Sequence, residues 1–154
     1  MFSPLSAKLA LGQLPTIKEP ILIDKWLIWL EQRPSESGRV TALIRPWGAP
    51  ELSPQELTPS PINLRTRIHV YGGCPLSASI CNDELLVVWI NSSDGGKLWT
   101  QNFQFDNQSQ SFQNKWFEAK SDPISLSSSI DYSLGDGLID VARQRWIGVM
   151  EKDG

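Results

Sequence analysis

The sequence predicts an all-β fold: a partial β-propeller of about two to three blades of antiparallel strands, preceded by a short N-terminal helix. Three observations carry this prediction. Short apolar runs alternate with clusters of Pro, Gly, Asn, Asp and Ser, which is typical of strands joined by turns. A strand–turn–strand pattern recurs along the chain, and its central strands are apolar on both faces. Helix signals are almost confined to the N-terminus.

Residues 4–12 are the predicted helix, with Ser6 as its N-cap and Gly12 as its stop. We assign residues 1–19 to this helix and a lead-in, and residues 20–154 to incomplete propeller blades. No segment of the sequence predicts a second domain.

The repeat has three copies, aligned on Trp29, Val88 and Gly148, which lie 59 and 60 residues apart. Copies one and two each contain a lead-in strand, a strongly apolar strand, a turn with Gly, and a return strand. Copy three contains a lead-in strand and an apolar strand. The apolar strands are Trp26-Leu-Ile-Trp-Leu-Glu31, Leu85-Leu-Val-Val-Trp-Ile90 and Trp146-Ile-Gly-Val-Met150.

The apolar strands distinguish two all-β architectures. A strand with one face in water alternates apolar and polar residues, whereas a strand buried on both faces need not. A propeller blade packs against a neighbouring blade on each side, so it requires such strands. A β-sandwich is the alternative, but it predicts cleaner alternation than residues 26–31 or 85–90 have.

The third copy reaches Asp153-Gly154, a strong hairpin-turn signal, with no return strand after it. We therefore expect this chain to be a fragment of a larger protein. An unpaired apolar strand invites pairing with another chain, so we also expect possible self-association through the open sheet edge.

Composition narrows the function classes. The formal net charge is −3, the isoelectric point is near 5.1, and no cluster of Lys and Arg stands out, which argues against nucleic acid as a partner. No apolar stretch approaches the ~20 residues of a membrane span, and no signal peptide is visible. We expect a cytoplasmic protein with two free thiols, Cys74 and Cys81. With His69 as the sole histidine, we expect no metal site and no cofactor.

One segment, Asn63-Leu-Arg-Thr-Arg-Ile-His-Val-Tyr-Gly-Gly73, stands apart. In an extended strand, Arg65, Arg67, His69 and Tyr71 would share one face. Such a face predicts a lined channel or tunnel, a ligand surface or an interdomain contact, and it makes these four residues the candidates for contact with a substrate. The alternative is a polar corner, in which the arginines and tyrosine cap a loop and His69 is a satisfied, partly buried residue.

The sequence offers no catalytic residues. A Ser-His-Asp triad on a strained Gly-x-Ser-x-Gly turn has no counterpart here. Cys74 lies five residues from His69, but no acidic or amide partner completes such a pair. Acidic residues such as Asp136 and Asp140 fit turns better than acid–base catalysis.

Several segments together resemble a known family. Leu57-Thr-Pro-Ser-Pro-Ile-Asn-Leu-Arg-Thr-Arg-Ile-His-Val-Tyr-Gly-Gly73 is similar to a segment near the N-terminus of bacterial serine peptidases of the prolyl oligopeptidase family, in its acylaminoacyl-peptidase/dipeptidyl-peptidase-like branch. Ser3-Pro-Leu-Ser-Ala-Lys-Leu9 resembles their start. Trp29-Leu-Glu-Gln-Arg-Pro-Ser-Glu-Ser-Gly-Arg39 resembles a strand and turn, and Gly135-Asp-Gly-Leu-Ile-Asp-Val-Ala-Arg-Gln-Arg145 a later strand pair.

The resemblance implies an N-terminal β-propeller stacked on a C-terminal α/β-hydrolase domain that holds the Ser-Asp-His triad. The propeller admits short peptides and excludes folded proteins. This chain would then be a non-catalytic, substrate-gating propeller segment whose partner is the absent hydrolase domain of a peptidase. One residue departs from the family: Val70 stands where relatives usually have Glu. This loss favours the alternative, a stand-alone, non-catalytic interaction module.

Overall fold

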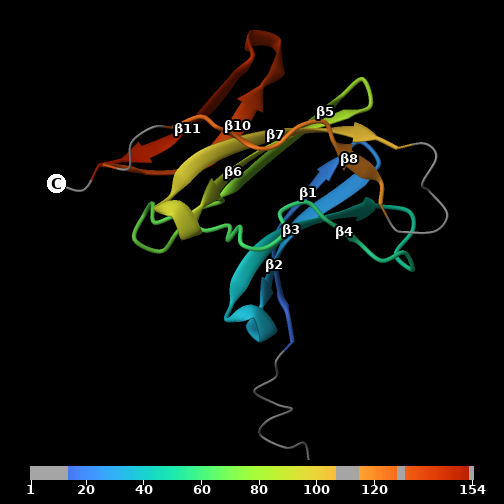
Figure 1. The fold of residues 1–154 in the computed structure, drawn as a ribbon, viewed down its shortest axis with the longest axis horizontal. Coiled ribbons are helices and arrows are strands. Elements are labelled where there is room, and N and C mark those ends of the chain that lie inside the picture. Colours follow the sequence, from blue (N-terminus) through green and yellow to red (C-terminus); the bar gives the residue numbers. More distant parts are fainter. Residues whose placement is uncertain (1–13, 107–114, 128–130, 153–154) are drawn as a thin grey trace, which may run out of the picture.

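The computed structural model describes residues 14–106, 115–127 and 131–152, which form two antiparallel sheets and a hairpin. The predicted helix at residues 4–12 lies outside the described residues. The described residues contain strands and three short 3-10 turns but no α-helix. The all-β prediction is therefore confirmed, and the arrangement is that of a partial propeller (Figure 1).

The first sheet has the strand order β1-β2-β3-β4, and its strands are consecutive in the chain. A 3-10 turn, η1 (Pro34–Glu36), joins β2 to β3 and ends at Ser37 and Gly38, both at positive φ. This is the turn that the sequence predicted between the first pair of strands. The bounds are β1 Thr16–Ile23, β2 Trp26–Arg33, β3 Arg39–Pro46 and β4 Gln55–Glu56.

The second sheet repeats this order as β5-β6-β7-β8, and a short strand β9 also pairs with β7. Its central turn, η2 (Ser92–Asp94), again ends in residues at positive φ, here Gly95 and Gly96. The repeat read from the sequence is therefore present in the backbone. The bounds are β5 Leu76–Cys81, β6 Glu84–Asn91, β7 Lys97–Phe105, β8 Phe117–Ala119 and β9 Ile124–Ser125.

The third hairpin consists of β10 (Ser133–Asp140) and β11 (Arg145–Glu151), joined by the turn η3 (Val141–Arg143). It lies against one side of the second sheet, and the first sheet lies against the other (red, green to yellow, and blue to teal in Figure 1). β1 begins at Thr16, inside the lead-in expected from the sequence.

Strand β6 shows why the apolar runs do not alternate. Leu85, Val87 and Trp89 project toward the first sheet and join a core with Trp26 and Ile28 of β2. Val88 and Ile90 project the opposite way and pack with residues of the third hairpin, including Leu134 and Trp146. Both faces of β6 are thus buried, as the sequence predicted for a blade between two neighbours.

Aromatic rings fill the core between the two sheets. Trp26 makes edge-on contacts with Phe105 and Phe117, with ring centroids 5.6 and 4.9 Å apart, and a tilted contact with Trp116 at 6.0 Å. Such pairs contribute about 0.5–1.5 kcal/mol beyond the burial of apolar area. These contacts join β2 to the far edge of the second sheet, so they fix the spacing of the two sheets.

A crossover segment, residues 57–75, carries the chain from the first sheet to the second. Its carbonyls at Thr58 and Ile62 accept hydrogen bonds from the buried guanidinium of Arg39, at 3.0 and 3.1 Å. Farther along, Leu64 bridges to Asn91 at the end of β6. The crossover is therefore anchored to both sheets before it reaches residues 65–71.

No helix in the described part of the chain is both long and apolar enough to cross a membrane.

Candidate functional site

The segment that contains Arg65, Arg67, His69 and Tyr71 is not a strand. After the bridge at Leu64 the backbone leaves the sheet, and residues 68–71 form a turn. The expectation that alternation places all four side chains on one strand face is therefore wrong. The reason is the left-handed backbone at His69 (φ 56°) and Val70 (φ 63°), which reverses the chain where a strand would continue.

Ile68 anchors this turn in the molecule. Its side chain is fully buried, and the Gly72 N–H donates to the Ile68 carbonyl at 2.9 Å, which closes the turn. A Cβ atom at Gly135 of β10 would collide with the Ile68 side chain, so the glycine makes room for it. Ile68 thus enters a space that only a glycine on the neighbouring strand can provide.

His69 clamps the turn to the third hairpin. Its Nε2 lies 3.2 Å from Asp136 Oδ2, and its Nδ1 lies 3.0 Å from Glu151 Oε1. The His69 backbone N–H also donates to Glu151 Oε2 at 2.7 Å. Both nitrogens are engaged, and His69 serves here as a bridge between two carboxylates.

Asp136 is positioned by a bulge in β10. The register with β11 shifts between Gly135 and Leu138, and Asp136 adopts φ 48° at this point. Its second carboxylate oxygen accepts a hydrogen bond from the Cys74 N–H at 2.6 Å. Strand β1 has a matching bulge, at which Glu19 adopts φ 49°. The repeat therefore places an acidic residue at a bulge in the first strand of two of its copies.

The tip of the turn is almost entirely in solvent. Val70 is 92% exposed and Tyr71 is 97% exposed. A β-branched residue rarely adopts positive φ, and strain of this kind persists only where surrounding contacts hold it. Two sets of contacts stabilise the tip. Ile68 and His69 make contacts on one side of it, and the Gly72 hydrogen bond lies on the other.

A hollow of about 460 Å³, the turn hollow, lies between this turn, the first sheet and β10. Tyr71 and Arg65 both line it, and its charged groups are balanced between two cations and two carboxylates. Those four groups are Lys18, Glu19, Arg65 and Asp136. The turn hollow can therefore accept a ligand that carries both signs of charge, such as a peptide.

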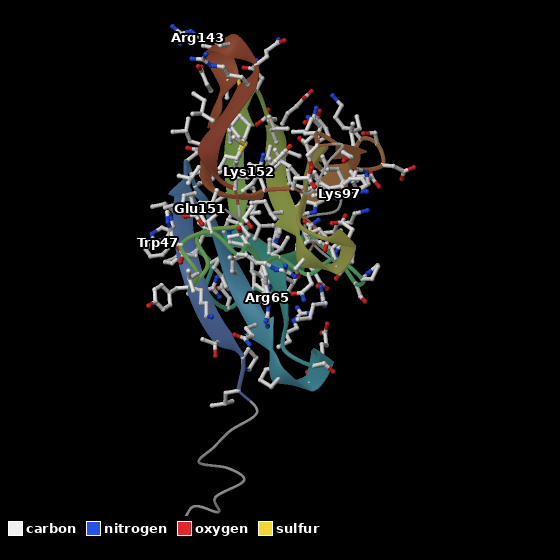
Figure 2. All side chains as sticks on the ribbon, turned by 90° about the vertical axis from the view of Figure 1, so that its left-hand side faces the viewer. Trp47, Arg65, Lys97, Arg143, Glu151 and Lys152 are labelled. Carbon is white, nitrogen blue, oxygen red and sulfur yellow. The ribbon has the colours of Figure 1, made fainter. Side chains whose placement is uncertain are left out.

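Arg65 and Arg67 also line a second hollow of about 430 Å³, the arginine hollow, on the other side of the crossover. Arg65 donates to the Gly38 carbonyl at 2.5 Å, in the turn after η1. Figure 2 shows Arg65 on the same side of the molecule as Glu151 and Lys152. The structure thus brings Arg65 and Tyr71 to one hollow and Arg65 and Arg67 to another, while His69 holds the turn between them.

Cys74 is not set up as a nucleophile. Its burial raises the pKa of its thiol, and the charges of Glu19 and Asp136 raise it further. The thiol donates to the Leu76 carbonyl at 3.2 Å rather than to His69. A partly buried, protonated thiol is a poor nucleophile, so the pairing of Cys74 with His69 that the sequence spacing allows is not formed.

Sequence reasoning missed the two carboxylates that matter most to the turn. The sequence pattern favours a turn role for Asp136 and gives no reason to select Glu151. The signal for Asp136 is its place between Gly135 and Gly137, since glycines inside a strand pattern indicate a bulge. Glu151 carries no comparable signal, because its role depends on pairing between segments 82 residues apart in the sequence.

No protein-family model and no curated protein matches this chain. Solved structures do match it in fold. One is a puromycin-hydrolyzing peptidase of Mycobacterium tuberculosis, with a TM-score of 0.66 and 22% identity over 90% of this chain. Another is a puromycin hydrolase, with a TM-score of 0.67 and 21% identity over 94% of this chain. A mutant of puromycin hydrolase complexed with PGG gives a TM-score of 0.68 and 21% identity over 95% of this chain.

The chain spans about a fifth of the length of these solved chains, with coverage of 19 to 20%. At this level of identity the likeness concerns the fold. It agrees with the resemblance to prolyl oligopeptidase-type peptidases noted in the sequence. The described part of this chain therefore has the fold of the N-terminal propeller portion of such peptidases.

Proposed function

We propose that this chain forms the first blades of the propeller of a cytoplasmic serine peptidase that hydrolyses short peptides, and that it gates access of substrate to a C-terminal α/β-hydrolase domain. Its fold over at least 90% of its length is shared with solved puromycin-hydrolysing peptidases, which supports this proposal. The chain itself is not the catalytic part, since catalysis would reside in the hydrolase domain.

The observation that carries the gating role is the turn tip. Val70 and Tyr71 extend into solvent beside the turn hollow, while His69 ties the turn to Asp136 and Glu151. An aromatic side chain that protrudes from a fixed turn narrows the proposed route of the substrate without closing it. In this proposal Tyr71 and Arg65 contact the peptide, and His69 is a positioning residue.

The gating role is tested in the full-length protein with Tyr71→Ala. We expect kcat/KM to rise severalfold for a peptide of about 20 residues and to stay unchanged for a dipeptide substrate, because the smaller tip widens the passage without touching catalysis. Ile124→Ala is the matched control, since Ile124 is 60% exposed but lies on β9 and lines neither hollow. Equal changes for long and short peptides would contradict gating.

A second candidate, a stand-alone, non-catalytic interaction module, is favoured by one observation. Apolar side chains on the third hairpin remain exposed, including Leu138 at 57% and Met150 at 64%. Exposed apolar groups clustered on a two-stranded sheet are typical of a surface that receives another protein. A reagent that labels catalytic serines distinguishes the two candidates. The native protein would react with it if it is a serine peptidase and would not react if it is an interaction module.

A further inference from the structure

The arginine hollow is built from three separate parts of the chain. The crossover provides one wall, the turn that follows β6 a second, and the start of β10 a third. Buried Ile90 and Leu134 provide an apolar floor, and polar groups surround it. The polar lining residues are Asn63, Arg65, Thr66, Arg67, Ser92, Tyr132 and Ser133.

The charge of its lining sets this hollow apart from the turn hollow and from a third hollow formed by described residues. The described residues that line it include two arginines and no carboxylate. The turn hollow has two cations and two carboxylates, and a third hollow, between the second sheet and the third hairpin, is lined by both Glu84 and Arg145. In a chain with a net charge of −3, a hollow lined by cations alone is an exception.

The two arginines are also less engaged than the other arginines. Arg33 and Arg39 are each paired with glutamates, and Arg143 and Arg145 with Asp140. Arg45 stacks on Trp29 and donates to the Pro50 carbonyl.

By contrast, Arg65 has a single partner among the described residues, the neutral Gly38 carbonyl. Arg67 forms no ion pair or hydrogen bond with any described residue. The hollow therefore presents guanidinium groups with free donors.

We propose that the arginine hollow binds a carboxylate, and specifically the C-terminal carboxylate of a short peptide. Guanidinium groups recognise carboxylates through paired N–H donors, and the donors of Arg67 are unused. Ser92 and Ser133 also line the site, and the floor formed by Ile90 and Leu134 suits the last side chain of the peptide. A volume of about 430 Å³ accommodates a ligand of this size. The inference rests on the proposed function insofar as that function brings short peptides to this surface.

The test is a calorimetric titration of the 154-residue chain with N-acetyl-trialanine and with its C-terminal amide. We expect the acid to bind at least about tenfold more tightly than the amide, since the amide lacks the charge that the guanidinium groups recognise. Added salt should weaken binding of the acid and leave the amide unaffected. Shifts of the amide resonances of Gly95, Gly96 and Ser133 on titration would locate the ligand in this hollow.

Arg67→Met keeps an unbranched apolar stem and removes the guanidinium with its charge, and we expect it to weaken binding of the acid about tenfold. Arg143→Met is the matched control, because Arg143 lies on η3 at the far end of the molecule from Arg65 (Figure 2). Equal affinity for acid and amide, or no effect of Arg67→Met, would overturn the proposal. If inorganic phosphate displaces N-acetyl-trialanine at an equal concentration, the assignment of the hollow to peptides is overturned.

A carboxylate can come from the C-terminus of a peptide or from an acidic side chain, and a further ligand distinguishes these two sources. N-acetylglutamate amide carries its carboxylate on the side chain, and we expect this compound to bind more weakly than N-acetyl-trialanine. Equal binding would overturn the assignment to the peptide C-terminus. The result is independent of catalysis: binding by the chain together with a native protein that hydrolyses no peptide would disprove the proposed function and leave the site in place.

Discussion

The turn at His69 combines a left-handed backbone with contacts to two carboxylates within a few residues. His69 and Val70 both adopt positive φ, and neither is a glycine. Ile68 is fully buried at one end of the turn, whereas Tyr71 is exposed at the other. The molecule therefore stabilises an unfavourable backbone through one buried side chain and two carboxylates, and it places an aromatic ring in solvent as a result.

The strain at Val70 gives a prediction about stability. Val70→Asn should raise the free energy of unfolding by about 1 kcal/mol, because asparagine tolerates the left-handed conformation and valine does not. Val70 is 92% exposed, so the substitution forfeits little apolar burial. Urea unfolding of both proteins measures the difference.

Val141→Asn serves as the control for this substitution. Val141 is exposed on η3 and is not among the residues at positive φ, so asparagine should bring no gain there. A Val70→Asn variant that is less stable than the unmodified chain would show that the turn does not strain Val70.

Among the elements, the crossover is held by a cluster of charged groups at the edge of the first sheet. Arg39 contacts Glu36 at 2.5 Å and Glu56 at 2.6 Å, and Arg33 reaches Glu56 at 3.1 Å. Burial acts to raise the pKa of Glu56, but the hydrogen bond from Arg39 and the charges of both arginines outweigh it. The pKa of Glu56 therefore lies below its ordinary value of 4.5.

This cluster predicts how stability depends on pH. A carboxyl group whose pKa is lower in the folded state stabilises that state above its unfolded pKa, and the contribution is lost as pH falls through the folded pKa. Between about pH 6 and about pH 3 the chain should therefore lose stability. Glu56→Gln should be less stable near neutral pH and should lose less on acidification, as urea unfolding at both pH values would reveal.

Glu118→Gln is the control for Glu56→Gln. Glu118 pairs with Lys115 on the surface, and its side chain is 64% exposed, so the pair contributes little. Its acid dependence should match that of the unmodified chain. An identical acid dependence in the Glu56→Gln variant would show that Glu56 does not anchor the crossover.

The same scale shows what the sequence could and could not predict. The apolar run of β6 lacks alternation because this strand packs on two neighbours, and this property is local enough to be visible in sequence. In β2 only one face packs on another sheet, and Trp29 on the other face is covered in part by Arg45. The turn at His69 was not predictable, because alternation at residues 65–71 suggested a strand. Its backbone is set by Ile68, Asp136 and Glu151, and two of these three are distant in the sequence.

At the scale of the whole molecule, the second sheet packs between the first sheet and the third hairpin. The third hairpin is the unit whose apolar side chains are least covered by the other two. Ile147 is 44% exposed and Val149 36%, in contrast to the fully buried Val87 at the centre of β6. A two-stranded sheet with exposed apolar groups is a site for association with another chain.

The exposed hairpin predicts self-association of the 154-residue chain. Sedimentation should show monomers that associate as concentration rises, and Met150→Glu should shift the equilibrium toward monomer by placing a charge on the hairpin. Ile124→Glu introduces the same charge at a residue of similar exposure on β9, and it should have little effect. A chain that stays monomeric at all concentrations would disprove self-association.

The most direct test of the account is the mass of the native protein in its source cells, measured by immunoblot with an antibody against this chain, together with labelling by a fluorophosphonate reagent for catalytic serines. Because the chain spans about a fifth of the peptidases it matches in fold, we predict a band about five times the 17.3 kDa of this chain, labelled by the reagent. An unlabelled band near 17 kDa would contradict a peptidase propeller and support the interaction module.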